Sequence, residues 1–92
     1  MKINPTPVDV LHRGDIFCFY KEEQLPKREP VNLYCVTDVD LFDNTLIVAI
    51  KRIINPISEL YVDTAFFKKA TIGRYSLSDV LDCKIYKVEP ND

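Results

Sequence analysis

Glycine and histidine are scarce in this chain, and their scarcity excludes several kinds of site. Only Gly14 and Gly73 occur among the 92 residues, whereas a phosphate-binding loop needs several glycines close together so that its backbone amides can reach the anion. His12 is the only histidine, so a metal centre would have to rely on cysteines and carboxylates. The sequence therefore predicts no cofactor and no metal site.

Cysteine is also rare, and its spacing does not suggest a site. Cys18, Cys35 and Cys83 are an odd number with no Cys-x-x-Cys pair, the usual start of a zinc site or a redox motif. Nothing places any of them at a strained turn or a helix start, where the pKa of a thiol falls and the thiol becomes a nucleophile. We expect three buried thiols in a reducing compartment. No catalytic residue is predicted, and the chain is expected not to be an enzyme.

Long apolar runs are missing as well. The longest, residues 46–50, is far shorter than the roughly 18 residues that a membrane-spanning helix requires, and residues 1–7 lack the apolar core of a signal peptide. We expect a cytoplasmic protein with no membrane partner. The formal net charge of −2 also disfavours nucleic acid as a partner, since proteins that bind it through phosphate contacts are usually basic.

The residues that are present suit one small globular domain covering residues 1–92. Apolar residues make up 47% of the chain and charged residues 28%, a balance typical of globular domains. Pro5 and Pro7 predict an extended N-terminal lead-in over residues 1–8, which would be either an edge of the fold or a tail. Residues 21–30, in which Pro26 and Pro30 lie among charged side chains, predict a long charged loop.

Residues 31–40 and 45–54 form the clearest pair of strands. In the first, Leu33 and every second residue up to Val39 share one face. The second is apolar on both faces until Lys51, as expected for a strand inside a sheet. Between them, Asp43 and Asn44 tolerate left-handed backbone angles and predict a tight turn. The sequence thus predicts a β-hairpin.

Further strands are expected around this hairpin. β-Branched and aromatic residues predict strands over 15–21, 60–67 and 84–88, while residues 71–75 fit either a short strand or a turn. Ser76 and Asp79 have the spacing of a capping box, which predicts one short helix near 76–83. The expected fold class is mainly β with a minor α+β character: a small, strongly bent antiparallel sheet or an SH3-like barrel of about five strands.

Three aspartates, Asp38, Asp40 and Asp43, cluster near the predicted turn. Carboxylates so close together can bind a hard cation, but the glycine and the distal glutamate of a calcium loop are missing. We favour a turn-forming and solubilising role for all three.

Exposed aromatic residues point to protein contacts. Phe66 and Phe67 would face opposite sides of a strand, so one of them would lie outside a one-sided core, and Phe42 lies in a turn. Exposed aromatic residues mark partner interfaces more often than other sites. We therefore expect a non-enzymatic small binding module that acts through contacts with another protein, or with itself as a homodimer. Such free-standing domains are typical of small accessory or inhibitory proteins, including those of bacteria and phages. The candidate interface consists of Phe42, Phe67, Glu22, Glu23, Lys27 and Arg28.

The alternative is a small β-barrel domain that binds RNA or single-stranded DNA. Aromatic rings interleaved with cations provide stacking platforms for unpaired bases. The candidate contacts are Lys51, Arg52, Lys68, Lys69, Arg74, Tyr61 and Tyr75. In addition, His-Arg-Gly-Asp-Ile-Phe at residues 12–17 and Tyr-Cys-Val-Thr-Asp-Val-Asp at residues 34–40 resemble the first strands of barrel modules of the PUA and ASCH type. That resemblance implies RNA binding but assigns no particular contact residue.

Overall fold

The computed structural model describes residues 2–7, 10–19, 30–54 and 64–89. Its centre is the predicted hairpin, formed by β3 (Pro30–Asp40) and β4 (Thr45–Ile54). The two strands pair antiparallel from Pro30↔Ile54 to Asp40↔Thr45. Strand β4 then pairs along its other side with β5 (Thr71–Ser76), which explains why its sequence is apolar on both faces. The predicted hairpin is confirmed.

The remaining strands extend the sheet from the other side of β3. Strand β2 (Ile16–Cys18) pairs with both β3 and β6 (Tyr86–Glu89). The lead-in forms β1 (Lys2–Pro7), which pairs with β6 at the end of the sheet. The sheet is antiparallel, and its strand order is β1-β6-β2-β3-β4-β5. Of the two predicted possibilities for the lead-in, an edge or a tail, the structure shows the edge. Two prolines suit that position because proline has no amide to donate to a second neighbouring strand.

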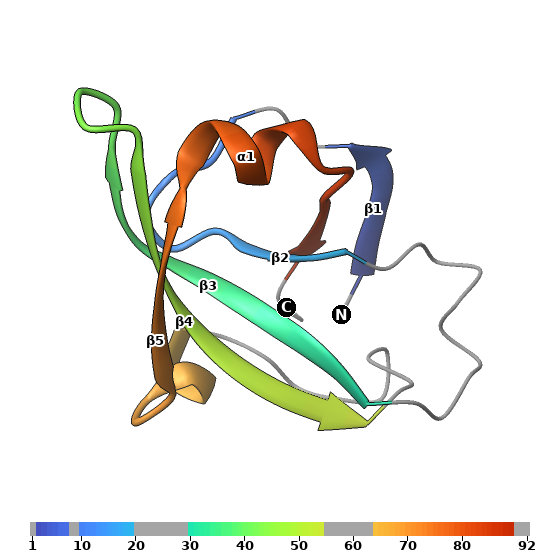
Figure 1. Ribbon diagram of the computed structural model, residues 1–92. Coiled ribbons are helices and arrows are strands. Elements are labelled where there is room, and N and C mark those ends of the chain that lie inside the picture. Colours follow the sequence, from blue (N-terminus) through green and yellow to red (C-terminus); the bar gives the residue numbers. More distant parts are fainter. Residues whose placement is uncertain (1, 8–9, 20–29, 55–63, 90–92) are drawn as a thin grey trace.

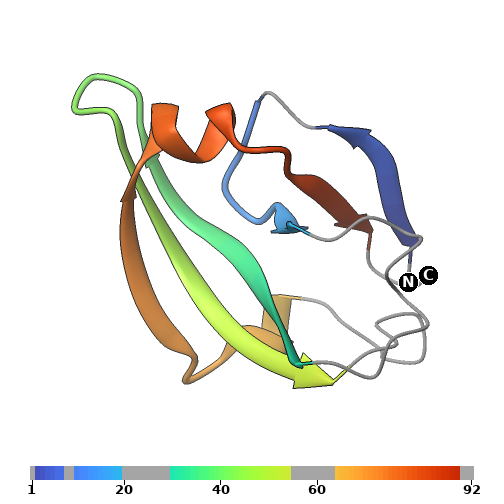
Figure 2. The same ribbon diagram turned by 45° about the vertical axis from the view of Figure 1, so that its right-hand side comes forward.

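The sheet bends strongly, so that its two halves face each other. Figure 2 shows β3, β4 and β5 as one wall and β2, β6 and β1 as the other. Helix α1 (Leu77–Asp82) crosses one end of the space between the walls (Figure 1). Within the described residues no pairing joins β1 to β5, so they are the two edges of an open sheet. The fold is thus mainly β, with one short helix.

Helix α1 begins where the capping pattern predicts. Ser76 is the N-cap, and its side chain accepts a hydrogen bond from the amide of Asp79. Leu77 and Val80 are the buried residues of the helix. Cys83 ends it in an extended conformation, and its amide donates to the carbonyl of Val80.

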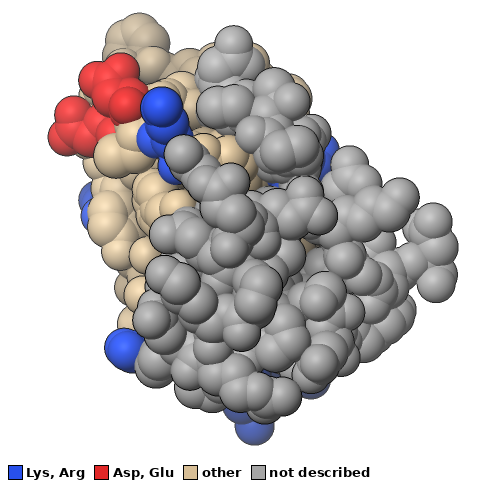
Figure 3. All heavy atoms as spheres, turned by 90° about the vertical axis from the view of Figure 1, so that its right-hand side faces the viewer, with Lys and Arg blue, Asp and Glu red and all other residues tan. Residues whose placement is uncertain are grey.

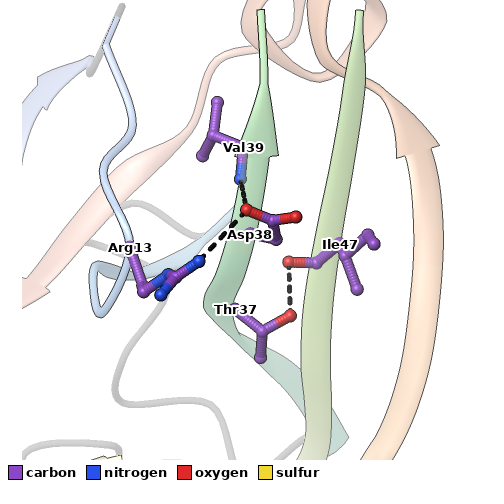
Figure 4. Close-up of polar contacts among 5 residues, drawn as sticks. All are labelled: Arg13, Thr37, Asp38, Val39 and Ile47. Carbon is purple, nitrogen blue, oxygen red and sulfur yellow. Dashed lines mark hydrogen bonds and ion pairs between the residues drawn. The ribbon is translucent and has the colours of Figure 1, made fainter. Parts of the chain in front are cut away.

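A β-bulge in β3 changes which residues share a face. Val36 is opposite Val48 and Asp38 is opposite Ile47, so Thr37 is an extra residue. The Thr37 hydroxyl donates to the carbonyl of Ile47 at 2.9 Å (Figure 4). As a consequence, Val39 packs with Val36 rather than with Leu33. The predicted alternation from Leu33 to Val39 is therefore wrong beyond Val36, because a single inserted residue reverses the faces of all residues after it.

The core consists of two clusters that draw on alternate residues of the same strands. The first lies on the side of η3, a 3-10 helix over Thr64–Phe67, and we call it the η3-side cluster; the second lies on the side of α1, and we call it the α1-side cluster. The η3-side cluster contains Ile16, Cys18, Leu33, Cys35, Ala49, Ile53, Phe67, Tyr86 and Val88. The α1-side cluster contains Leu11, Phe17, Val36, Leu46, Val48, Leu77, Val80 and Ile85. Because neighbours such as Ile16 and Phe17 belong to different clusters, both faces of the sheet are covered.

The segment before β5 is not the strand that was predicted. Residues 64–67 form a 3-10 helix, η3 (Thr64–Phe67), and residues 60–63 lie outside the described part of the chain. Consecutive side chains of a 3-10 helix are about 120° apart rather than opposite. Phe67 is therefore buried and Phe66 packs against the same η3-side cluster, with their ring centroids 5.4 Å apart. The expectation that one of these rings lies outside the core is wrong.

No helix in the described residues is long and apolar enough to cross a membrane.

Candidate functional site

The most exposed large apolar side chains are at the tip of the β3–β4 hairpin. Leu41 is 81% exposed and Phe42 is 98% exposed. The two residues are adjacent in the turn that follows Asp40, and in Figure 1 this tip projects past the end of α1. We call Leu41 and Phe42 the apolar tip. From the sequence we predicted that Phe42 is exposed in the turn. We did not predict this for Leu41, although the same argument applies to it.

The backbone of this turn is held by side-chain hydrogen bonds. The Asp40 carboxylate accepts from the amides of Phe42 and Asp43, both at 3.0 Å. Four residues, 41–44, connect the last strand pair. Among them Asn44 has a left-handed backbone, with a φ of 53°. The expected tight turn centred on Asp43 and Asn44 is therefore a four-residue turn, in which Asp40 supplies the bonds that a shorter turn would make through its backbone.

Asn44 fastens this turn to the start of α1. Its side-chain amide donates to the hydroxyls of Ser76 and Ser78, each at 3.0 Å, and its oxygen accepts from the amide of Ser78 at 2.9 Å. Its carbonyl accepts from the amide of Leu77 at 3.0 Å. A turn held from both ends has little backbone freedom left to lose on binding. The apolar tip is thus preorganised.

Acidic residues lie beside the apolar tip. Asp38 is bonded to Arg13, with 3.3 Å between the guanidinium nitrogen and the carboxylate oxygen, and it also accepts from the amide of Val39 (Figure 4). Asp40 is occupied by the turn amides. Among the residues described, no group of three potential metal ligands is close enough to hold an ion.

A second apolar feature lies on the α1 side of the sheet. Phe17 and Tyr34 are stacked with their centroids 5.1 Å apart, and Phe19 meets Tyr34 edge to face at 5.3 Å. Together with Tyr75 and Val80 they line a small recess of about 40 Å³. Phe19 and Tyr75 are each about two-fifths exposed. The recess is close to the size of a few water molecules, so we read it as a gap at the edge of the core.

Tyr75 lies directly over Gly73. A Cβ atom added to Gly73 would come within 2.8 Å of the Tyr75 ring, so the absence of a side chain at Gly73 is what lets the ring approach the backbone of β5 this closely. The sequence suggested only a stacking role for Tyr75, and it suggested no role for Gly73.

The predicted contacts of the nucleic-acid alternative are divided between the two faces of the sheet. Arg74 and Tyr75 are neighbours in β5 and therefore point to opposite faces of the sheet. Lys51 lies over the ring of Phe66, 4.8 Å from its centroid, whereas Arg52, the next residue of β4, points to the other face. Lys68 and Lys69 are exposed in the turn between η3 and β5. Figure 3 shows the coloured basic atoms at several separate points of one face, not in one patch.

The other candidate residues do not lie on a described exposed surface. Glu22, Glu23, Lys27, Arg28 and Tyr61 lie outside the described residues. Phe67 is 6% exposed, so its side chain does not form part of the apolar surface.

The expectation that all three thiols are buried is wrong for Cys83, which follows the end of α1 and is exposed.

The buried thiols and the histidine show no catalytic arrangement. Cys18 and Cys35 are buried, and burial, together with the nearby Asp15 carboxylate, raises the pKa of the Cys35 thiol. A raised pKa lowers the thiolate fraction and makes the thiol a poorer nucleophile. His12 is exposed, and both its backbone amide and its ring lie against Asp15 in the turn before β2.

Comparisons with protein-family models, with curated proteins and with solved structures found no match to this chain.

Proposed function

We propose that this protein is a non-enzymatic binding module that inserts the apolar tip of its β3–β4 hairpin into an apolar recess on a partner protein. The observation that carries the proposal is the nearly complete exposure of Leu41 and Phe42 on a turn that Asp40 and Asn44 hold in place. An exposed phenylalanine gains most when it enters a well-packed pocket. A preorganised turn also reduces the entropy that binding costs.

The charges around the apolar tip suggest the character of the partner. Asp43 is in the same turn, and Asp38 and Asp40 are at the end of β3. A recess with a basic rim would complement these carboxylates and favour the correct orientation on approach. Occupying a recess on another protein is how a small accessory or inhibitory protein acts. We place the protein in the cytoplasm, where the Cys35 and Cys83 thiols would stay reduced.

A photo-activatable phenylalanine analogue at position 42 tests this proposal in the cells that make the protein. We expect one discrete cross-linked adduct, and mass spectrometry then identifies the partner. The matched control carries the analogue at position 10, because Val10 is also exposed but lies outside the turn. The same adducts from both positions, or none from position 42, would count against the proposal.

Purified partner then allows a quantitative test with Phe42→Ser. We expect the affinity to fall about thirtyfold, which corresponds to roughly 2 kcal/mol for the loss of an aromatic anchor. The free energy of unfolding should change by less than about 1 kcal/mol, because Phe42 has almost no contacts to lose. Val10→Ser should bind normally. If Phe42→Ser unfolds the protein, Phe42 is a core residue and the proposal fails.

The nucleic-acid alternative has one observation in its favour. Lys51 lies over Phe66, and Lys68 lines a depression on the same side of the sheet as Phe67, so cations and aromatic rings are neighbours there. In this alternative, the predicted small barrel domain corresponds to the bent sheet, and single-stranded RNA or DNA would bind on this side of it. Anisotropy titrations with labelled oligonucleotides at low salt distinguish the two functions, because this binding would fall steeply as salt is added.

A further inference from the structure

Strand β5 is an edge of the sheet, and backbone amides and carbonyls on its outer side are not paired with another strand of the described residues. The carbonyl of Asn44 accepts from the amide of Leu77 at the end of the β4–β5 ladder. Because hydrogen-bonded pairs alternate along an antiparallel ladder, the amides of Gly73 and Tyr75 point to β4 and those of Ile72 and Arg74 point outward. No strand among the described residues covers that outer side. Figure 2 shows β5 as the free margin of its wall.

This edge lacks the usual devices that prevent pairing with another chain. Protected edges carry prolines, bulges or several charges. Strand β5 pairs with β4 without a register shift, contains no proline and has one charged residue, Arg74. Its apolar side chains are also uncovered, since Ile72 is 63% exposed and Tyr75 is 42% exposed.

The two ends of β5 carry opposite charges. Lys68 and Lys69 are separated from the strand by Ala70 alone and make no ion pair with another described residue. At its other end, Asp79 lies in the first turn of α1 and Asp43 lies in the adjoining hairpin turn. An antiparallel copy of the same edge would place the lysines of each chain beside the aspartates of the other, whereas a parallel copy would place like charges together. The edge therefore complements itself only in the antiparallel orientation.

We propose that two copies of this protein associate through their β5 strands, paired antiparallel about a two-fold axis at Gly73. In this register Ile72 is opposite the partner's Arg74, and Thr71 is opposite the partner's Tyr75. A shift of the axis to Arg74 would bring the two guanidinium groups face to face, which is unfavourable for directly opposite residues. The small size of a single-strand contact makes the dimer one of moderate affinity that dissociates on dilution.

This surface is separate from the apolar tip. The tip follows β3 and lies at the Ser76 end of β5, so the two tips would lie at opposite ends of the dimer and remain free. Two linked tips can engage a multivalent partner with an increased effective concentration. The dimer is measured on the purified protein alone, so its failure would leave the proposed function of the tip untouched.

The first test is sedimentation velocity from roughly 5 to 500 µM, a range in which a weak dimer shifts with protein concentration. We expect a monomer–dimer equilibrium. Ile72→Lys places a second cation opposite the partner's Arg74, and since the two-fold axis doubles each unfavourable pair, the dissociation constant should rise at least about tenfold. Its fold should be unchanged, because Ile72 is largely exposed. Phe42→Ser is the matched control and should dimerise normally.

The orientation is tested by exchanging charges between the two ends. Lys68→Glu combined with Lys69→Glu makes both ends of one variant acidic, and Asp79→Lys makes the other variant more basic at its aspartate end. Each variant alone should be largely monomeric, and an equimolar mixture should recover the dimer, because both junctions then pair opposite charges. Circular dichroism checks that each variant is folded. A wild-type protein that stays monomeric at the highest concentration, or a mixture that recovers nothing, would overturn the proposal.

Discussion

Phe42 and Phe67 show how differently two residues of one type behave in this fold. Both were expected at a protein interface from their exposure, yet Phe42 is almost fully exposed and Phe67 is buried in the η3-side cluster. Phe42 lies in the turn after β3, where its amide donates to the Asp40 carboxylate. Phe67 ends a 3-10 helix that turns both of its phenylalanines toward the sheet. The local backbone conformation, rather than hydrophobicity, decides the role of each ring.

The same contrast separates the cysteines, and it can be measured. Cys18 is 0% exposed and Cys35 is 5% exposed, whereas Cys83 is exposed. We expect a thiol reagent to modify Cys83 rapidly in the native protein and to modify Cys18 and Cys35 only after unfolding. The raised pKa of Cys35 slows its reaction further, because its thiol remains protonated at pH values where an ordinary cysteine is partly ionised. Mass-resolved alkylation over time gives the three rates, and a fast reaction at Cys35 would contradict the structure.

At the scale of elements, Asn44 joins the hairpin turn to α1. It supplies a left-handed residue to the turn and bonds to the first residues of the helix. No sequence pattern within the hairpin turn or within α1 predicts this link, because Asn44 and Ser78 are 34 residues apart. The link explains how a short helix with few buried side chains is kept in place across the end of the sheet.

Substitutions of Asn44 separate its two contributions. Asn44→Gly keeps the left-handed backbone but loses the side-chain hydrogen bonds, and we expect a loss of about 1–2 kcal/mol of unfolding free energy. Asn44→Ala loses the bonds and also strains the turn, so it should cost roughly 1 kcal/mol more. Chemical denaturation of both variants provides the measurement. Equal stability of the two variants would mean that the left-handed backbone is not maintained in solution.

At the scale of the whole molecule, the two core clusters share one sheet and should unfold together. Leu33 belongs to the η3-side cluster and Leu46 to the α1-side cluster, and each is 0% exposed. Truncating either to alanine should lower the free energy of unfolding by about 2–5 kcal/mol. Because β2, β3 and β4 each contribute residues to both clusters, each variant should shift a single transition.

Two probes check this cooperativity. Far-ultraviolet circular dichroism follows the sheet, and fluorescence follows the five tyrosines together, among which Tyr34 packs with the α1-side cluster and Tyr86 belongs to the η3-side cluster. We expect the two unfolding curves to coincide in the wild type and in both variants. Separate midpoints would show that the two faces of the sheet are independent folding units.

Much of the local structure was predictable from the sequence, because it depends on neighbouring residues. The alternation in residues 31–36, the apolar run of β4 and the serine before Leu77 were sufficient for the hairpin and the helix start. The prolines of the lead-in limited it to an edge or a tail, and its pairing with β6 decided for the edge. The exposure of Phe42 also followed, since a residue in a turn between paired strands has little core within reach.

Only the tertiary structure decided which faces and edges are covered. The bulge at Thr37 follows Val36, whose amide donates to the carbonyl of Asp15. The bulge moves Val39 to the face of the α1-side cluster. The burial of Phe67, the fastening of Asn44 to α1 and the uncovered edge of β5 likewise depend on segments that are distant in the sequence. A local pattern specifies an element, whereas burial and exposure are set by whatever the fold brings against it, and the proposed contact surfaces of this protein are the parts left uncovered.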